Sequence, residues 1–114
     1  MRVAKEQVEV KMAIPGAVLR QRKDFGDASG YGKISGEYFS LAAGVDTTPL
    51  FQGLEGNLCQ CPHWGFVLDG EITTSNASGE QERVHTGDLF YWPLGHNVRV
   101  DRDAEIIMFS PQHE

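Results

Sequence analysis

The sequence predicts an all-β protein in which short antiparallel strands close into a barrel or a sandwich. Glycine, proline and asparagine interrupt the chain about every 6 to 12 residues, a spacing typical of strands joined by turns. No window keeps a 3.6-residue hydrophobic period between helix caps, so no long helix is expected. One predicted hairpin follows another with no crossover helix, which disfavours a parallel α/β sheet.

Length and charge set the limits of the interpretation. The 114 residues predict one domain over 1–114, with N-terminal strands and a loop over 1–33 and the motif-bearing core over 34–110. A net charge of −6 argues against binding to nucleic acid or to an anionic membrane surface. The charged N-terminus resembles no secretory signal, and two cysteines make no disulfide framework. We therefore expect a cytoplasmic protein with reduced thiols.

The first half of the chain gives weak signals for strands. Val8, Val10 and Met12 alternate with polar residues until Pro15 and Gly16 break the pattern. The further elements expected here are a short strand at Ala17–Leu19, a loop over Lys23–Gly32, a strand at Glu37–Ala42 that ends before Gly44, a short strand at Pro49–Gln52 and a glycine-rich loop at Gly53–Asn57.

The second half gives clearer signals. Cys59–Leu68 is predicted to be extended, Asp69-Gly70 to be a hairpin turn, and Glu71–Thr74 to be the partner strand of that hairpin. The remaining predictions are a turn at Asn76–Gly79, a strand at Gln81–His85, a turn at Thr86–Asp88, a strand at Leu89–Trp92, a turn at Pro93–Gly95, and two separate strands at His96–Val100 and Glu105–Phe109.

A metal site is the main chemical hypothesis. Alternate residues of a strand share a face, so Cys59, Cys61 and His63 would point the same way. Thiolate and imidazole suit zinc first, with nickel, iron or copper as alternatives. A fourth ligand would come from a neighbouring strand, and His96 is the best-placed remaining histidine. Two other interpretations stay open: small buried cysteines beside a core histidine, or a strained Cys59–Cys61 disulfide.

The same segment predicts two further features. Gly65 continues the metal-facing side and, having no side chain, would leave space for water or a small ligand. Trp64, Phe66 and Leu68 form an apolar row on the opposite face. An apolar row on the outside of so small a barrel predicts a homodimer.

Residues 57–102 resemble the two motifs of the cupin superfamily. Phe66-Val67-Leu68-Asp69-Gly70 matches the core of the first motif, and counting back from Gly70 puts His63 at the family's glutamate position. Asn57 and Cys59 fall at the two histidines of the family's H-x-H pattern. The second motif reads Gly87, then Pro93, Leu94 and Gly95. Its histidine position holds Val98, and this chain has His96 two places earlier, on the same face of the strand.

The resemblance implies a cupin-type double-stranded β-helix, or jelly-roll barrel, with a metal site inside. None of the family's usual histidines is kept, and Cys61 has no counterpart in the family pattern. The resemblance therefore implies a variant, sulfur-rich site at Cys59, Cys61, His63 and His96. A three-ligand site without Cys61 is the alternative. Cupins include dioxygenases and isomerases, and the fold does not choose between activities.

Several other residues are expected to form the pocket beside the metal. Tyr38 and Phe39 lie on a strand that would cross the barrel, so one of them should face the cavity. Tyr91, Trp92 and Val98 are the other pocket candidates. His85 is expected to face solvent, and His113 is given no role. The preferred function is a metal-holding barrel that binds or senses a small molecule; the alternative is a metal-dependent enzyme acting on a small organic substrate.

Overall fold

The computed structural model describes residues 1–27, 32–47, 61–93 and 95–111. These residues form a short 3-10 helix and seven strands. The elements are η1 (Lys5–Gln7), β1 (Val10–Ile14), β2 (Ala17–Arg22), β3 (Ile34–Leu41), β4 (His63–Asn76), β5 (Gln81–His85), β6 (Leu89–Trp92) and β7 (His96–Pro111). Among the described residues, no helix has the length and apolar character needed to cross a membrane.

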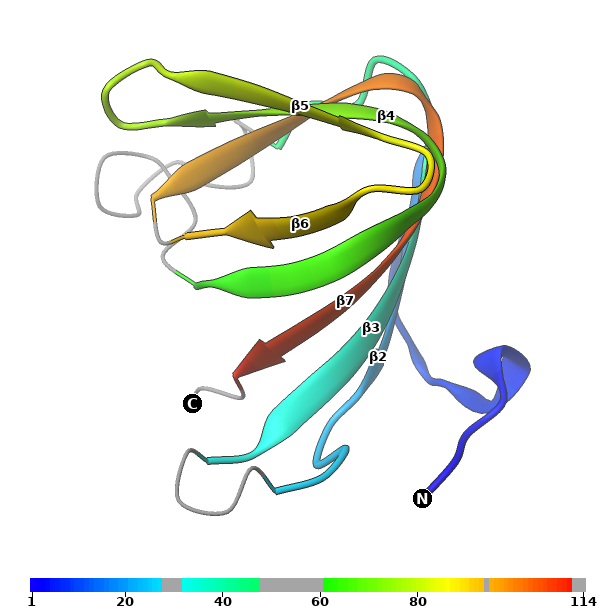
Figure 1. The fold of residues 1–114 in the computed structure, drawn as a ribbon. Helices are drawn as coiled ribbons and strands as arrows, with labels where there is room; N and C mark the ends of the chain where they lie inside the picture. The colour runs from blue at the N-terminus through cyan, green and yellow to red at the C-terminus, as the bar shows by residue number, and fades with distance from the viewer. Residues whose placement is uncertain (28–31, 48–60, 94, 112–114) are drawn as a thin grey trace.

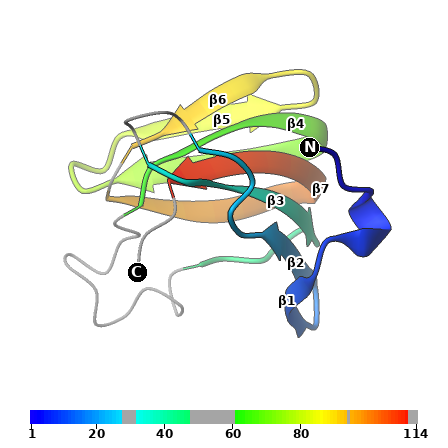
Figure 2. The same ribbon diagram turned by 90° about the horizontal axis from the view of Figure 1, so that it is seen from below.

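The strands form one antiparallel sheet that bends over on itself. The order is β1-β2-β3-β7-β4-β5, and β6 pairs with the first part of β4. The long strands β4 and β7 turn sharply at the right of Figure 1, so their two halves belong to two facing layers. Seen from below, the N-terminal hairpin of β1 and β2 continues the layer that contains β3 (Figure 2). The prediction of an all-β fold is confirmed.

The Asp69-Gly70 pair makes the bend in β4 and not a hairpin turn, so that prediction was wrong. Strand β4 runs unbroken through these residues, and its register with β7 shifts between Val67 and Ile72. Gly70 has φ +108°, and a Cβ there would lie 2.4 Å from the carbonyl oxygen of Asp103. A positive-φ glycine serves a bulge as well as it serves a turn. Glycine is required at this position because β7 approaches β4 too closely for a side chain.

The two strands predicted at 96–100 and 105–109 are one continuous strand, β7, and this is a second correction. The charged residues between them lie on the convex side of the bend, where they remain exposed. Asp103 Oδ1 accepts a hydrogen bond of 2.8 Å from the backbone N–H of Ala43. Ala104 is buried against Gly70 on the concave side. The polar residues at 101–103 therefore lie on the outer side of a bent strand and do not interrupt it.

The segment predicted to be extended from Cys59 is a strand only from His63 onward, because Cys61 lies in a bend. Several other predicted elements agree with the structure. Strands β5 and β6 have the predicted bounds, while β2 and β3 are longer than predicted. The turn between β4 and β5 is held by Asn76, whose Oδ1 accepts hydrogen bonds from the backbone N–H groups of Ser78 at 3.1 Å and Glu80 at 3.0 Å. The strand predicted at 49–52 and the loop predicted at 53–57 lie outside the described residues.

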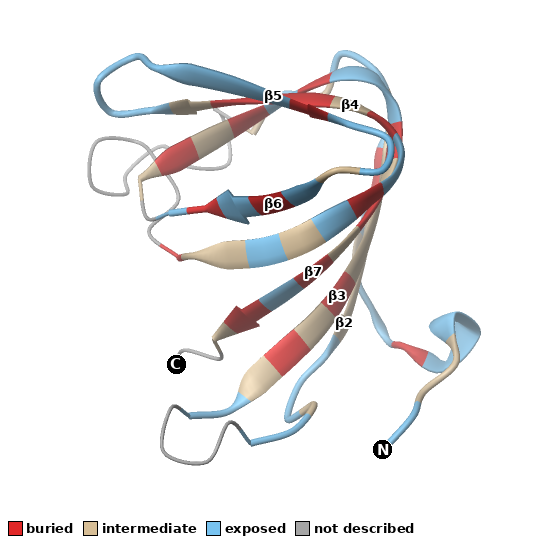
Figure 3. Ribbon diagram, viewed as in Figure 1, coloured by how far each residue is buried: buried red, intermediate tan, exposed pale blue. Residues whose placement is uncertain are grey.

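The core fills the space between the two layers. Every even-numbered residue of β7 except Arg102 is buried, as period-two alternation requires. Figure 3 shows buried residues alternating with less buried ones along β6 and β7. The largest fully buried side chains are Ile72, Ile106, Val67 and Val100. This core closes the bent end of the barrel and leaves the opposite end, where β4 and β7 begin, for the cavity.

Candidate functional site

A cavity of about 280 Å³ lies between the layers. Its polar lining consists of Asp46, Thr47, His63 and His96. The apolar lining comes from six segments and consists of Met12, Ile14, Ala17, Phe39, Leu41, Val45, Trp92, Val98, Ile106 and Met108. The two histidines begin β4 and β7, so they lie at the strand ends. Leu41, which pairs with Ala104, lies nearer the bend.

His96 is the more buried of the two histidines, and its tautomer is fixed by the backbone. Its Nδ1 lies 2.7 Å from the carbonyl oxygen of Pro93, at the start of the turn between β6 and β7. A carbonyl oxygen only accepts, so Nδ1 carries the hydrogen and the lone pair of the neutral ring is on Nε2. Burial lowers the pKa of His96 below its ordinary value, and the hydrogen bond to Pro93 opposes that shift. A neutral imidazole with a fixed tautomer is the form that binds a metal ion.

His63 is positioned by the last strand. Its Nδ1 lies 2.5 Å from Ser110 Oγ, near the end of β7. Ser110 is itself buried, and its carbonyl oxygen accepts a hydrogen bond of 3.4 Å from Ser35 Oγ on β3. A hydrogen bond to Nδ1 orients an imidazole so that Nε2 is presented elsewhere, the arrangement usual for metal-binding histidines.

The structure brings two of the four predicted ligands together. The ring centroids of His63 and His96 are 5.1 Å apart, with an interplanar angle of 73°. Cys61 is buried two residues before His63 and has its thiol 3.6 Å from the carbonyl oxygen of Pro62. Within the described residues, no group of three or more histidine, cysteine or acidic side chains is arranged to hold a metal ion. Cys59 lies outside the described residues.

Gly65 faces inward as expected, but it leaves no space beside the histidines. A Cβ at this position would lie 2.3 Å from the carbonyl oxygen of Ile107 and 2.4 Å from Cζ of Phe90. The ring of Phe90 therefore fills the volume that the sequence assigned to water or a ligand. The glycine is required because β6 and β7 approach β4 from both sides.

The predicted pocket residues divide between the two faces. Trp92 and Val98 line the cavity, and of the pair Tyr38 and Phe39 it is Phe39 that does so. Tyr38 lies on the outer face, where the ammonium group of Lys5 is 5.8 Å from its ring centroid. Tyr91 is half exposed and lines a separate hollow of about 220 Å³, which also contacts Trp92 and His96.

Sequence reasoning missed several buried polar groups of the barrel. Ser35 and Glu37 are buried on β3, and Ser35 Oγ donates a hydrogen bond of 3.4 Å to Glu37 Oε1. Their alternation with Gly36 and Tyr38 is the signal that could have placed them inside. Trp92 is buried, and among the described residues its indole N–H has no hydrogen-bond partner.

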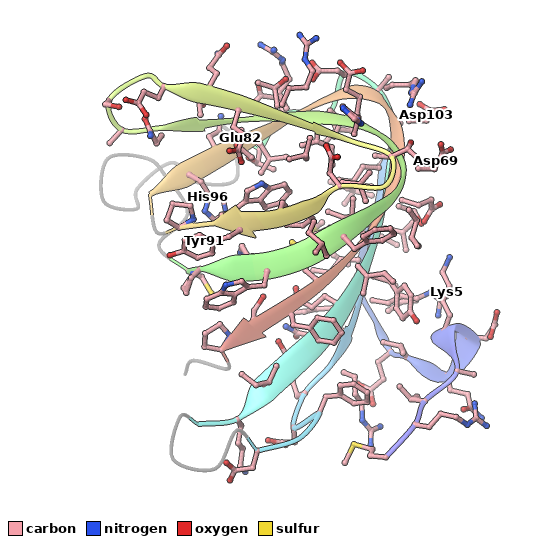
Figure 4. The ribbon with its side chains drawn as sticks, viewed as in Figure 1. Lys5, Asp69, Glu82, Tyr91, His96 and Asp103 are labelled. Atoms are coloured by element: carbon pink, nitrogen blue, oxygen red, sulfur yellow. The ribbon has the colours of Figure 1, made fainter. Side chains whose placement is uncertain are left out.

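The other two histidines take no part in this site. His85 is exposed, with its Nδ1 3.5 Å from Asp88 Oδ2, in agreement with its expected solvent-facing position. His113 lies outside the described residues. Figure 4 shows His96 at the open end of the barrel, far from the bend that carries Asp69 and Asp103.

Comparison with known proteins identifies the fold. No protein-family model and no curated protein matches the sequence. Among solved structures, KdgF from Halomonas sp. matches with a TM-score of 0.62 and 18% identity over 97% of this chain and 93% of that one. Oxalate decarboxylase from Lactobacillus farciminis matches with a TM-score of 0.63 and 16% identity over 94% of this chain. A Bacillus subtilis oxalate decarboxylase matches with a TM-score of 0.64 and 16% identity over 94% of this chain.

The bent antiparallel sheet is thus a jelly-roll barrel. Within that class, the chain has the cupin fold, which confirms the resemblance seen in the sequence. The match covers 31% and 28% of the two oxalate decarboxylase chains, so this chain spans about a third of their length. At this level of identity the likeness establishes the fold and leaves the activity open.

Proposed function

We propose that the protein is a metal-binding cupin barrel that holds a small organic molecule beside the ion. The observation that carries the proposal is the pair of imidazoles at the cavity wall, with ring centroids 5.1 Å apart. Zinc–nitrogen bonds are about 2.1 Å long, so rings this close can share one ion. The Nδ1 atoms of both rings are already engaged, by Ser110 and by Pro93.

The donor set fits a thiophilic divalent ion. His63 and His96 would supply two nitrogen ligands, and Cys59 or Cys61 would supply sulfur. One solved structure with this fold is described by its Mn(II) centres, in Bacillus subtilis oxalate decarboxylase. Nitrogen and thiolate ligands favour zinc over the oxygen-preferring manganese. When bound, the ion would act as a Lewis acid toward an oxygen atom of the ligand.

The test is metal binding by matched histidine variants. Protein stripped with chelator and reloaded with Co²⁺ should bind one equivalent. His63→Ala and His96→Ala should each lower the affinity at least about 10-fold, because each removes a ligand. His85→Ala, at an exposed site, should leave it unchanged. Thiolate-to-cobalt absorption that disappears in Cys59→Ser or in Cys61→Ser would identify the sulfur ligand. Equal affinities in all three histidine variants would refute the proposal.

A metal-dependent enzyme is the second candidate, favoured by the carboxylate of Asp46 in the lining of the same cavity. An enzyme of this kind needs an open coordination position, whereas four protein ligands close the site. Water-proton relaxation of the Mn²⁺- or Cu²⁺-loaded protein separates the two candidates. An exchangeable water on the ion supports catalysis, and its absence supports binding alone.

We also infer that the outer face of β4, β6 and β7 pairs with a second copy of the chain. The exposed large hydrophobic side chains on this face are Trp64, Phe66, Leu68, Leu89, Tyr91 and Phe109. Strand register makes them neighbours: Trp64 lies between Tyr91 and Phe109, and its ring stacks on Tyr91 at 5.2 Å. A two-fold interface must be complementary to itself. An uncharged apolar patch meets that condition, and a patch of one charge does not.

Light scattering tests this interface. The wild-type protein should have about twice the chain mass of 12.6 kDa. Trp64→Glu should shift it to the monomer because it places a charge in the centre of the patch. Val10→Glu changes an equally exposed apolar residue on β1 and should leave the dimer intact. A monomeric wild-type protein would refute the proposed dimer interface.

A further inference from the structure

We infer that the ligand of this cavity is a small, mainly apolar molecule with a single oxygen-bearing head group, which lies toward His63 and His96. The inference rests on the proposed function only for the position of the head group. The apolar character of the rest of the ligand follows from the cavity lining. Ten of the lining side chains are apolar, and the polar ones are Asp46, Thr47 and the two histidines.

The apolar part of the lining is assembled from β1, β2, β3, β6, β7 and Val45. Phe39 and Leu41 on β3 pair with Ile106 and Ala104 on β7, which places them toward the bend. Met12 and Ile14 come from β1, the first strand of the chain. The N-terminal strands thereby add an apolar wall to a cavity whose polar groups belong to later segments.

The charges of the lining argue against a ligand with several anionic groups. Among the described lining residues there is no lysine or arginine, and Asp46 contributes a negative charge. A charge placed against apolar side chains loses its hydration without gaining a partner. One anionic or polar head could be satisfied at the histidine end. A second at the far end could not.

The volume limits the size of the ligand. The cavity holds about 280 Å³. A cavity of about 150 Å³ is large enough for benzene, so this one suits about ten to twelve non-hydrogen atoms. Drug-sized ligands occupy pockets of about 300–1,000 Å³, which places the expected ligand at the small end of that range. A medium-chain alkyl or a substituted single aromatic ring has this size.

The position of Trp92 adds a second, independent observation. Its indole N–H is buried and, among the described residues, has no hydrogen-bond partner. The ring lines the cavity and lies 5.8 Å from that of His96. A buried donor without a partner is destabilising unless something accepts its hydrogen bond. An oxygen head group near His96 is the kind of acceptor that would satisfy it.

The experiment measures binding of straight-chain carboxylic acids to zinc-loaded protein by calorimetry, with a parallel series on metal-stripped protein. From butanoate to octanoate, affinity should rise about four-fold per methylene, because each buried methylene contributes about 0.8 kcal/mol. Octanedioate has the same chain length with a second carboxylate at the far end. It should bind at least about 100-fold more weakly than octanoate, since that carboxylate would be buried against apolar groups.

Two variants on one strand connect the result to this cavity. Ile14 lines the cavity and Val10 does not, and both are about half exposed, so both positions should tolerate a polar side chain. Ile14→Glu should weaken octanoate binding at least about 10-fold, as expected for a charge in an apolar wall. Val10→Glu should leave the affinity within two-fold of wild type. Circular dichroism confirms that both variants fold.

The outcomes separate this inference from the proposed function. Affinity that does not change with chain length, or octanedioate that binds as well as octanoate, would overturn the inference even if the protein binds metal. The same holds if Ile14→Glu and Val10→Glu behave alike. If the wild-type protein binds no metal but its affinity for the acids still rises with chain length, the inference is supported and the proposed metal site is refuted.

Discussion

The two faces of β4, β6 and β7 differ in what covers them, although both are apolar. On the inner face, Val67 and Phe90 are buried by the facing layer of the same chain. On the outer face, their neighbours Phe66 and Leu89 remain exposed. Strands buried on one side normally alternate apolar and polar residues. Here the alternation is lost, which is the composition expected of strands covered on both sides.

The comparison has a consequence for stability. Inner-face positions are surrounded by fixed backbone and core side chains, so adding or removing one methyl group changes the free energy of unfolding. Outer-face positions have free space in the single chain and acquire neighbours only if a second copy binds. Substitutions on the two faces should therefore differ in size, and only those on the outer face should depend on protein concentration.

The largest expected effect is at Gly65 on the inner face. Gly65→Ala should destabilise the protein by about 3 kcal/mol or more, because the new methyl group meets the Ile107 carbonyl and the Phe90 ring. The matched control is Gly79→Ala in the turn before β5. Gly79 has φ +85° and no atom within 4 Å of an added Cβ, so only backbone strain of about 1 kcal/mol is expected. Urea unfolding measures both, and equal losses would mean that β4 is loosely packed.

A smaller effect should separate the adjacent residues Val67 and Leu68. Val67 is fully buried, and Val67→Ala should cost about 2 kcal/mol through the cavity it leaves. Leu68 is 45% exposed, so Leu68→Ala should cost less than about 1 kcal/mol in dilute protein. The measurement is urea unfolding at two protein concentrations. If the outer face is a dimer interface, the loss at Leu68 grows with concentration while the loss at Val67 does not.

Alternation along single strands was readable from the sequence. The period of two put His63 and Gly65 on one side of β4 and Trp64 and Phe66 on the other, and the structure agrees. Turns that depend on one local hydrogen-bonding residue, such as Asn76, were also readable. These features are decided within a few residues, so no tertiary information is needed to find them.

Features decided by distant contacts were not readable. Gly70 has the positive φ that a hairpin turn would use, and only the approach of Ala104 shows that it is a bulge in a continuous strand. The same limit applies to the candidate site. The sequence offered His96 only as the best-placed remaining histidine, and the cupin resemblance supported its pairing with His63. The contact between His63 and Ser110 joins residues 47 positions apart in sequence, and no local pattern indicates it.

The smallest expected effect concerns the outer surface of the second half of β4, where polar residues replace the apolar row. Thr73 Oγ1 donates a hydrogen bond of 2.5 Å to Asp101 Oδ2. This bond, assisted by Arg99, holds the pKa of Asp101 below its ordinary value of 3.8. A carboxyl group with a lowered pKa in the folded state contributes stability above its unfolded pKa, and loses that contribution as the pH falls through its folded value.

Thr73→Val should therefore cost about 1 kcal/mol at pH 7 and less at pH 3, which lies below the ordinary pKa of 3.8 for this carboxyl group. Urea unfolding at the two pH values measures the difference. Asp101→Asn keeps an acceptor for Thr73 but removes the charge, so in that background the cost of Thr73→Val should no longer depend on pH. A cost that is equal at pH 7 and pH 3 in the wild-type background would mean that Thr73 stabilises the fold through packing alone and not through its hydrogen bond to the Asp101 carboxylate.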